Sequence, residues 1–228
     1  MLLQQLELLN IDGKDLATIS RTERREFRRE VQPIFQDPYG SYNPFYKVDH
    51  VLFSPINNFK MAESRDEAVD MVEKALELVG LVPAETLGRL PHQLSGGKRQ
   101  RVMVARALLL KPRVILADEP VSAVDASLRA TILDAVSKLN KELGLAIVYV
   151  NHDLTTSYQI RDEILILYIG NLVEAGDVET VIKNPKHPYT QLLIDSIPEA
   201  DPGKKWGKLD MEKTQNKILT SPSVGWRK

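Results

Sequence analysis

Two acidic residues, Asp118 and Glu119, follow directly after a short apolar run, Val114 to Ala117. A buried strand that delivers two carboxylates to its open end suits a site in which one carboxylate binds Mg²⁺ and the other orients a water molecule. Taken alone, the pair equally fits an ordinary solvated strand end. His152 follows a second apolar run, Leu145 to Val150. There it fits a residue that senses a phosphate or orients a nucleophile, and it also fits an ordinary loop histidine.

A third group of residues is suited to binding an anion. Ser95, Gly96 and Gly97 precede a helix that is predicted from about Lys98 to Leu110, where a Lys-Pro pair ends it. Small residues at a helix start leave backbone N–H groups open to an anion. The chain therefore carries, in sequence order, an anion-binding helix start, two carboxylates and a histidine.

The two apolar runs predict the sheet that positions these groups. Between them, residues 132–143 trace one apolar helix face that closes at Gly144. Strand, helix and strand in this order, with both strands apolar at every position, predict a buried parallel sheet with a right-handed crossover. The polar residues after the strands then meet at one sheet edge, which is where ligands bind in open α/β sheets.

Other segments give weaker patterns. Ser64 and Glu67 form a capping box, and apolar residues then recur at helical spacing as far as Gly80. Residues 10–30 are strongly charged and suit a solvated helix, whereas periodicity resolves no element in residues 32–60. Residues 163–167 and 172–174 predict a β-hairpin whose turn lies within one residue of Gly170-Asn171.

The composition excludes several classes of protein. The 228 residues carry 30 Lys and Arg against 31 Asp and Glu, a net charge of −1, which argues against binding nucleic acid by charge alone. The chain has no Cys, so disulfides, thiolate metal sites, iron–sulfur clusters and a cysteine nucleophile are excluded, and a reducing cytoplasm is compatible with it. The longest apolar runs are far shorter than the roughly 18 to 20 residues that cross a bilayer. The first residues lack the features of a signal peptide.

In the segments that carry the two carboxylates, the histidine and the anion-binding helix start, the sequence resembles the ATP-binding cassette (ABC) ATPases. LSGGKRQRV resembles the family's signature, VILADEP its Walker B motif with the catalytic Glu, SAVDAS its D-loop, His152 its switch histidine, and Phe35-Gln36-Asp37-Pro38 its Q-loop. Five motifs in the family's order and spacing make the resemblance specific. It covers roughly residues 10–200.

Two stretches are similar to the ATPase subunits of oligopeptide, dipeptide and nickel importers: QDPYGSYNPF at the Q-loop and NPKHPYTQLLIDSIPEADP after the core. The resemblance implies an α/β fold with a P-loop NTPase-like parallel sheet core, N-terminally truncated, and a helical subdomain at about residues 38–111. Residues 1–183 would form the ABC ATPase domain without its Walker A portion. Residues 184–228 would form the C-terminal extension and tail.

The resemblance implies roles for four residues around ATP and Mg²⁺. Gln36 would reach Mg²⁺ and the attacking water, and its loop would report the nucleotide state to the membrane subunits. Asp118 would hold Mg²⁺, and Glu119 would polarise the water. His152 would contact the γ-phosphate.

The remaining site residues would act on the nucleotide of a second subunit. Ser95, Gly96 and Gly97 would grip the γ-phosphate that the opposite subunit binds, and Asp125 would cross the dimer interface. Lys98 replaces the Gln that is usual after LSGG, which adds a positive charge near that phosphate. Hydrolysis would therefore require two chains.

The resemblance also implies partners and a location. The partners are a second ABC ATPase subunit, identical or different, integral membrane permease subunits, and indirectly an extracytoplasmic solute-binding protein, with no nucleic acid. The chain would lie peripherally on the cytoplasmic face of the cell membrane and couple ATP hydrolysis to uptake of peptides or nickel. The importer-like C-terminal stretch argues against a cytosolic ABC protein of translation or DNA metabolism.

One family motif has no counterpart in the sequence. Gly-Lys pairs begin at residues 13, 97, 203 and 207, and none is followed by Ser or Thr, so there is no Walker A motif. The family places this motif before the segment that Leu8 to Leu16 match, so we expect the chain to begin just after it.

Without the Walker A backbone and Lys, we expect weak or absent ATP binding by this chain. The loss of a core strand with it would leave an apolar gap, an unpaired sheet edge and poor solubility. Three explanations remain open: a start site placed too late, a split or decayed gene, and a non-catalytic interaction subunit that donates its signature to a partner cassette.

Overall fold

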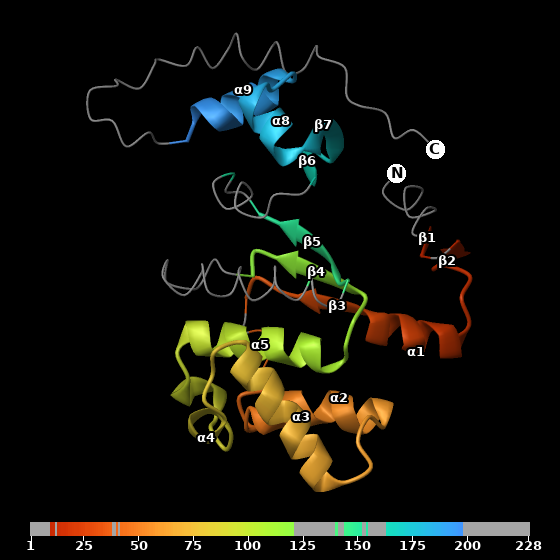
Figure 1. Cartoon of the computed structure of the whole chain (residues 1–228), viewed down its shortest axis with the longest axis vertical. Helices are drawn as coiled ribbons and strands as arrows, with labels where there is room; N and C mark the ends of the chain where they lie inside the picture. Colours follow the sequence, from red (N-terminus) through yellow and green to blue (C-terminus); the bar gives the residue numbers. More distant parts are fainter. Residues whose placement is uncertain are drawn as a thin grey trace. The chain divides into compact units, whose positions relative to one another are not determined.

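The computed structural model describes residues 10–11, 13–37, 40, 42–120, 140, 144–151, 154 and 163–197. The chain divides into two compact units, Met1–Val150 and Asn151–Lys228 (Figure 1). The domain boundary at residue 183/184 stays a prediction. Within the described ranges, no helix is long and apolar enough to cross a membrane.

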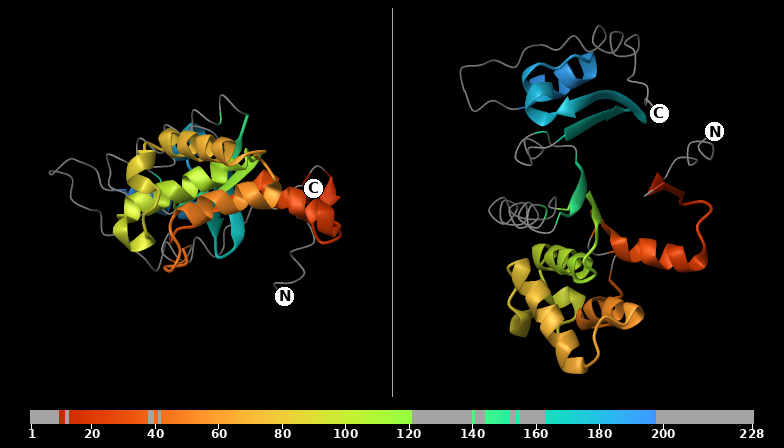
Figure 2. Two further views of the ribbon diagram at one scale, coloured as in Figure 1. Left: turned by 90° about the horizontal axis from the view of Figure 1, so that it is seen from below. Right: turned by 45° about the vertical axis from the view of Figure 1, so that its right-hand side comes forward.

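A three-stranded parallel sheet lies at the centre of the first unit. Its strands are β3 (Val31–Ile34), β4 (Val114–Asp118) and β5 (Ala146–Val150), in that spatial order. The parallel pairing of the two apolar runs is therefore confirmed. Helix α5 (Gly96–Leu109) lies between this sheet and the helices α2 (Asp49–Phe59) and α3 (Arg65–Leu78) (Figures 1 and 2). The predicted crossover helix at 132–143 lies almost wholly outside the described residues.

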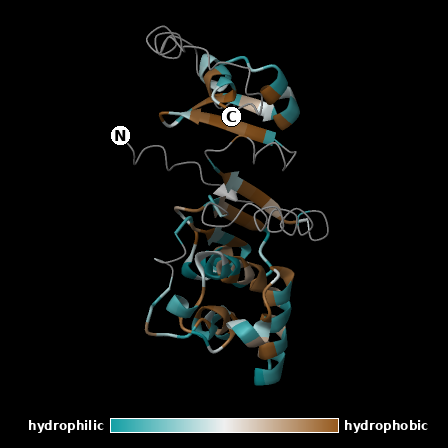
Figure 3. Ribbon diagram, turned by 90° about the vertical axis from the view of Figure 1, so that its left-hand side faces the viewer, coloured by the Kyte–Doolittle hydropathy of each residue, from teal (hydrophilic) through white to brown (hydrophobic). Residues whose placement is uncertain are grey.

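The sheet buries one face only among the described residues. Ile115 and Ala117 are buried in the core with α5, whereas Leu116, Val148 and Val150 are 43%, 50% and 54% exposed. Alternate strand residues point to opposite faces, and the described helices cover one of these faces. Burial of the second face stays a prediction, because residues 121–139 lie outside the described part of the chain; the strands are apolar along most of their length (Figure 3).

The outer edge of β5 is also open within the described strands, since β5 pairs with β4 alone. An uncovered apolar face beside an unpaired strand edge is a surface that promotes association. The described strands fit the predicted unpaired sheet edge, and the predicted apolar gap stays a prediction.

Helix α3 (Arg65–Leu78) begins where the sequence predicted. The Ser64 Oγ atom accepts a hydrogen bond from the backbone N–H of Glu67 at 3.1 Å, as an N-cap does. The second hydrogen bond of the predicted capping box differs. The Glu67 carboxylate accepts from the backbone N–H of Glu63 at 2.7 Å, and not from that of Ser64. Helix α5 is confirmed too, and it starts at Gly96 with Ser95 as its N-cap.

Two elements in residues 31–60 gave no periodic signal. They are β3, which contains Pro33, and α2 (Asp49–Phe59), which contains Pro55 and has no side-chain N-cap. Both form because their apolar residues reach the core that α3 and α5 share; Leu52 and Ile56 of α2 are essentially fully buried there. Short elements of this kind depend on tertiary packing more than on local propensity.

The single helix expected in residues 10–30 is shorter than predicted. Helix α1 (Arg21–Glu30) is closed at its start by a full capping box between Ser20 and Glu23. Before it, the antiparallel pair β1 (Asn10–Ile11) and β2 (Lys14–Asp15) uses the turn at Gly13. The charge pattern identified the helix but could not show where it begins.

Replacing Leu76 with Ala is expected to lower the free energy of unfolding by about 2 to 5 kcal/mol, because the side chain is fully buried between α3 and α5. Leu78→Ala on the same helix is the control, since Leu78 is 54% exposed, and it should cost less than about 1 kcal/mol. Urea unfolding followed by circular dichroism measures both. Equal losses would contradict the assigned helix face.

The second unit is built on the predicted hairpin. Strands β6 (Glu163–Tyr168) and β7 (Asn171–Asp177) are antiparallel. The turn residues are Ile169 and Gly170, with φ of 47° and 74°, so the turn lies one residue earlier than the Gly170-Asn171 pair. Two positive φ angles are what a type I′ turn requires.

Two short helices cover one face of this hairpin: α8 (Val178–Lys183) and α9 (Pro188–Asp195). Their apolar residues bury Ile164, Ile166 and Val173 of the strands. The sequence did not indicate α8, because its N-cap Asp177 is also the last residue of β7.

A buried carboxylate joins β7 to the start of α9. Glu174 accepts hydrogen bonds from the backbone N–H groups of Lys186 at 2.8 Å and His187 at 3.0 Å. Burial opposes ionisation of this carboxyl, but Thr190, the two N–H donors and the nearby His187 outweigh burial, so the Glu174 pKa is lowered.

This lowered pKa predicts acid sensitivity. Because the folded-state pKa lies below the unfolded one, ionised Glu174 stabilises the fold at neutral pH, and this contribution is lost as the pH falls below about 4.5. The difference in unfolding free energy between wild type and Glu174→Gln should therefore shrink toward acid pH in urea titrations. Glu163→Gln, an exposed change on β6, is the control. A difference for Glu174→Gln that is independent of pH would contradict the assignment.

Candidate functional site

The structure brings two of the predicted site residues into contact at the carboxyl edge of the sheet. Gln36 follows β3 and Glu119 follows β4, and the Gln36 Nε2 atom donates a hydrogen bond to the Glu119 carboxylate at 2.6 Å. The two residues are 83 positions apart in the chain. They meet because β3 and β4 are parallel neighbours whose carboxyl ends lie at the same edge.

Glu119 has an unusual backbone. Its φ is 42°, in the left-handed region that costs a residue with a side chain roughly 1 to 2 kcal/mol. Its N–H donates to the carbonyl oxygen of Val150, the last residue of β5, at 2.9 Å. This bond holds Glu119 across the end of the sheet. Strain kept in place by neighbouring structure is typical of functional positions.

Asp118 is the last residue of β4 and is exposed. Among the described residues, no cluster of three or more His, Asp and Glu side chains is arranged to hold a metal ion. Mg²⁺ does not need one, because it usually binds through one or two carboxylates together with phosphates and waters. Asp118 and the amide oxygen of Gln36 are donors of the right chemistry at the right sheet edge.

The predicted anion-binding residues form the start of α5. The Ser95 Oγ atom accepts from the backbone N–H of Lys98 at 3.3 Å. The Lys98 ammonium group lies 3.5 Å from the Glu85 carboxylate of the short helix α4 (Pro83–Thr86). Both side chains are partly exposed, so the pair contributes at most about 1 kcal/mol. The charge that Lys98 adds therefore stands beside a carboxylate.

Arg101 fixes the same end of α5 to the residues that end α3. Its guanidinium donates to the carbonyl oxygen of Gly80 at 2.9 Å and to that of Gly97 at 3.4 Å. Burial lowers the Arg101 pKa, and the carbonyl partners satisfy the buried donors. The start of α5 is thereby held against the end of α3.

Two predicted residues, Asp125 and His152, lie outside the described residues, so their proposed roles stay predictions.

The sequence did not indicate two hydrogen bonds around the Q-loop. The Gln100 side chain donates to the carbonyl oxygen of Phe35, and the Tyr42 hydroxyl donates to that of Arg99. These pairs are 65 and 57 positions apart, and no local pattern marks such contacts.

Comparison with known protein families identifies the chain. Residues 2–122 match the family described as "ABC transporter". The chain therefore belongs to the ABC transporter family. Residues 173–225 match the "Oligopeptide/dipeptide transporter, C-terminal region", so the second part of the chain is that of the peptide-transporter branch.

Curated relatives agree with this placement. "Oligopeptide transport ATP-binding protein OppF" of Salmonella typhimurium is 40% identical over 190 residues, which are 83% of this chain and 57% of that protein. "Dipeptide transport ATP-binding protein DppF" of Escherichia coli is 41% identical over 197 residues, 85% of this chain and 58% of that protein. The chain thus spans less than two thirds of the length of these relatives.

Solved structures share the fold. A dimeric ATP-binding cassette in a post-hydrolysis state, bound to ADP and Pi, superposes with a TM-score of 0.66 at 29% identity, covering 74% of this chain and 72% of the other. The cbiO1 protein of Clostridium perfringens, part of an ABC transporter complex, gives a TM-score of 0.66 at 26% identity, covering 80% and 74%. The predicted P-loop NTPase-like α/β fold is confirmed.

Proposed function

We propose that this chain works in the ATP-hydrolysing subunit of an ABC importer for peptides, with nickel as the alternative cargo. The observation that carries the proposal is the Gln36–Glu119 hydrogen bond, which joins the Q-loop to the end of the Walker B strand beside the capped signature helix. The peptide-transporter C-terminal region supports the choice of cargo.

Glu119 acts as the general base in this proposal. Its carboxylate accepts a proton from the water that attacks the γ-phosphate of ATP, the substrate. Gln36 holds this carboxylate through its Nε2 atom at 2.6 Å, which leaves the amide oxygen of Gln36 available as an acceptor. His152 contacts the γ-phosphate. Catalysis of this kind depends chiefly on positioning and charge stabilisation.

Asp118 and the amide oxygen of Gln36 are the side-chain groups that would hold Mg²⁺. When bound, Mg²⁺ neutralises charge on the oxygens of the β- and γ-phosphates. Asp118 supports this assignment because it ends β4 directly before Glu119 and is exposed at the sheet edge.

Ser95, Gly96 and Gly97 bind the γ-phosphate held by a second ABC subunit, and Asp125 crosses the interface between the two. The capped start of α5 supports this role, since its first N–H groups are available to an anion. The partner cassette can be identical or different. A non-catalytic chain that lends only this signature remains the second candidate, because the sequence contains no Walker A motif.

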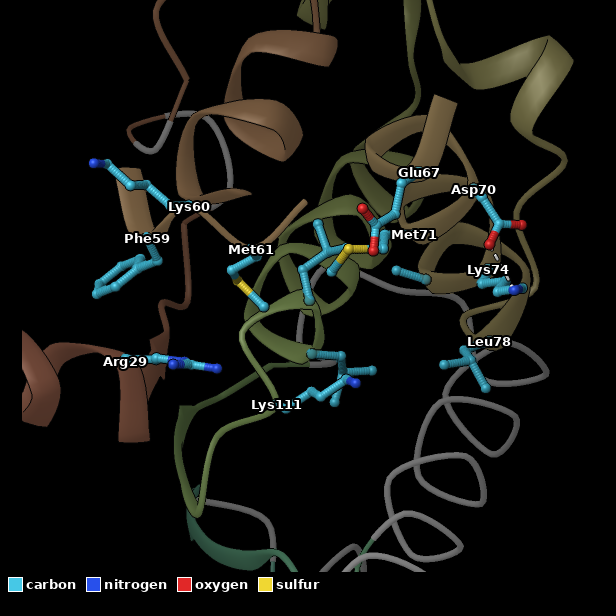
Figure 4. A pocket seen from close by; sticks show the side chains of 13 residues that line it. Arg29, Phe59, Lys60, Met61, Glu67, Asp70, Met71, Lys74, Leu78 and Lys111 are labelled. Atoms are coloured by element: carbon cyan, nitrogen blue, oxygen red, sulfur yellow. Dashed lines mark hydrogen bonds and ion pairs between the residues drawn. The ribbon is translucent and has the colours of Figure 1, made fainter. Parts of the chain in front are cut away.

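A groove of about 580 Å³ in the first unit is suited to docking a permease. It lies where α3 meets the ends of α2 and α5 (Figure 4). Arg29, Lys60, Lys74 and Lys111 contribute cations to it, and the carboxylates of Glu67 and Asp70 line it too, with Lys74 paired to Asp70 at 2.6 Å. Its apolar lining consists of Phe59, Met61, Met71, Ala75, Leu78, Leu108 and Leu109.

An apolar, methionine-containing groove with charges of both signs fits a short amphipathic helix. We therefore assign it to a cytoplasmic segment of the permease. In this proposal the chain lies peripherally on the cytoplasmic face of the membrane, and a solute-binding protein acts on it only through the permease.

Met71→Glu should weaken binding of the permease at least about tenfold, because it buries an unpaired carboxylate in the apolar lining. Val82→Glu introduces the same charge at an exposed valine that does not line the groove, and it should leave binding unchanged. Binding to permease in nanodiscs measures both variants. Equal binding by Met71→Glu and wild type would remove the groove from the permease interface.

Titration of the purified 228-residue chain with fluorescent ATP and Mg²⁺, with and without a partner cassette, tests the proposed function. We expect weak or no binding by the chain alone, because the Walker A groups are missing from the sequence. Tight binding alone would support catalysis by this polypeptide as it stands. If neither the chain nor its mixture with a partner binds or hydrolyses ATP, the proposed function is wrong for this chain.

A further inference from the structure

The loop from Phe35 to Tyr42, which begins with the Q-loop residues, is tied to the signature helix at both of its ends. At the first end, the Gln100 Nε2 atom donates to the carbonyl oxygen of Phe35 at 3.2 Å, directly before Gln36. At the second end, the Tyr42 hydroxyl donates to the carbonyl oxygen of Arg99 at 2.8 Å. Arg99 and Gln100 are neighbours on α5, so both ends of the loop are bonded to one turn of this helix.

That turn lies within the signature motif LSGGKRQRV, directly after Ser95-Gly96-Gly97-Lys98. Ser95 caps α5, and Arg99 lies four residues later, about 6 Å along the helix axis at 1.5 Å per residue. A helix turn with intact backbone hydrogen bonds moves as one piece. A displacement of the Ser95 end therefore carries the carbonyl oxygen of Arg99 and the side chain of Gln100 with it.

Both tethers are buried. Tyr42 is 8% exposed and Gln100 is 1% exposed. Burial raises the pKa of the Tyr42 hydroxyl, against the opposing charges of Arg99 and Arg106, so the hydroxyl remains a donor at every physiological pH. Water does not replace a buried bond, and its loss leaves the acceptor unsatisfied.

The Gln100 amide lowers the stability of the fold, and packing alone does not explain why an amide stands at this position. Its Oε1 atom is buried and accepts no hydrogen bond from the described residues. A helix position with a purely packing role would be better filled by an apolar side chain of the same volume. The amide is retained where its N–H fixes the residue before Gln36.

We propose that Tyr42 and Gln100 are positioning residues that couple the signature helix to Gln36, so that engagement of the signature by a second subunit's nucleotide is transmitted to the Gln36–Glu119 contact. The role of this coupling in ATP hydrolysis rests on the proposed function. The mechanical link itself belongs to this chain alone and can be measured without nucleotide.

The test is a double-mutant cycle read by hydrogen exchange in the full chain. Ser95→Ala removes the cap bond to Lys98 and loosens the first turn of α5. The readout is the exchange of the Phe45 and Tyr46 amides, which are hydrogen-bonded to Asn43 just after Tyr42. In the wild-type background we expect Ser95→Ala to speed this exchange about fivefold, the size of one lost hydrogen bond.

In the Tyr42→Phe background, Ser95→Ala should have no additional effect on these amides, because the tether is already missing. Tyr46→Phe is the matched control. It removes a hydroxyl from an exposed tyrosine that stacks on His50, and it should leave the effect of Ser95→Ala intact. Unchanged exchange along α3 verifies that each variant is folded.

A second variant tests the other tether. Gln100→Met keeps the volume and removes the donor, so it should speed exchange at Gln36 and Asp37 with no change along α3. The proposal is overturned if Ser95→Ala has the same effect with Tyr42 and with Phe at that position, or no effect in either. Neither result depends on ATP, so failure of the coupling and failure of the proposed function are distinguishable.

Discussion

Glu119→Gln is expected to slow ATP hydrolysis by the assembled transporter about 100- to 10,000-fold, the range for loss of a general base. The substitution keeps an oxygen that accepts the hydrogen bond from Gln36 Nε2, so the Q-loop should stay in place. Nucleotide binding should be nearly unchanged. Single-turnover phosphate release measures the rate, and fluorescent ATP measures binding.

The matched control is Glu77→Gln, which removes an exposed carboxylate on α3 away from the sheet edge and should leave the rate unchanged. The result separates the two candidate functions. A wild-type rate for Glu119→Gln would show that this chain only donates its signature to a partner's nucleotide. A large loss supports hydrolysis at the site that Glu119 itself forms.

Ser95→Arg is expected to abolish hydrolysis at the partner's nucleotide, with a loss of at least about 100-fold in rate. An arginine side chain would fill the space in front of the N–H groups of Gly96 and Gly97, and it would also remove the cap bond to Lys98. Phosphate release by the two-subunit assembly measures the effect, with dimer formation followed by sedimentation.

Ser95→Ala separates these two causes. It loses the cap, worth about 0.5 to 2 kcal/mol of stability, and the hydroxyl proposed to contact the γ-phosphate, but it leaves the space before the N–H groups of Gly96 and Gly97 open, so it should retain more of the hydrolysis rate than Ser95→Arg. If Ser95→Arg hydrolyses ATP at the wild-type rate, α5 does not face a nucleotide and the signature assignment is wrong. Equal losses of hydrolysis rate in Ser95→Ala and Ser95→Arg would show that the cause is the loss of the Ser95 side chain and not the blocked space in front of Gly96 and Gly97.

Much of the fold was available from local sequence. The cap at Ser64, the periodic residues after it and the Lys-Pro pair after Leu110 locate α3 and α5 within two residues. The apolar runs locate β4 and β5. These elements are predictable because each one is specified by residues within a turn or two of its ends.

The site was predictable in part for the same reason. Motif resemblance identified Gln36, Asp118, Glu119 and the Ser95 helix start. The sequence did not show that Gln36 and Glu119 touch, nor that Glu119 adopts a left-handed backbone held by Val150. The roles of Asp125 and His152 still depend on the resemblance alone.

Sequence by itself thus determined the family, the order of the motifs and the helices and strands with strong local signals. Only the tertiary structure decided that β3 and α2 form, that Leu116 and Val148 are exposed among the described residues, and that Tyr42 and Gln100 bond to residues 57 and 65 positions away. These features depend on contacts between distant segments. Such contacts form only when the parallel strands and α5 are packed together, and no local pattern of residues encodes them.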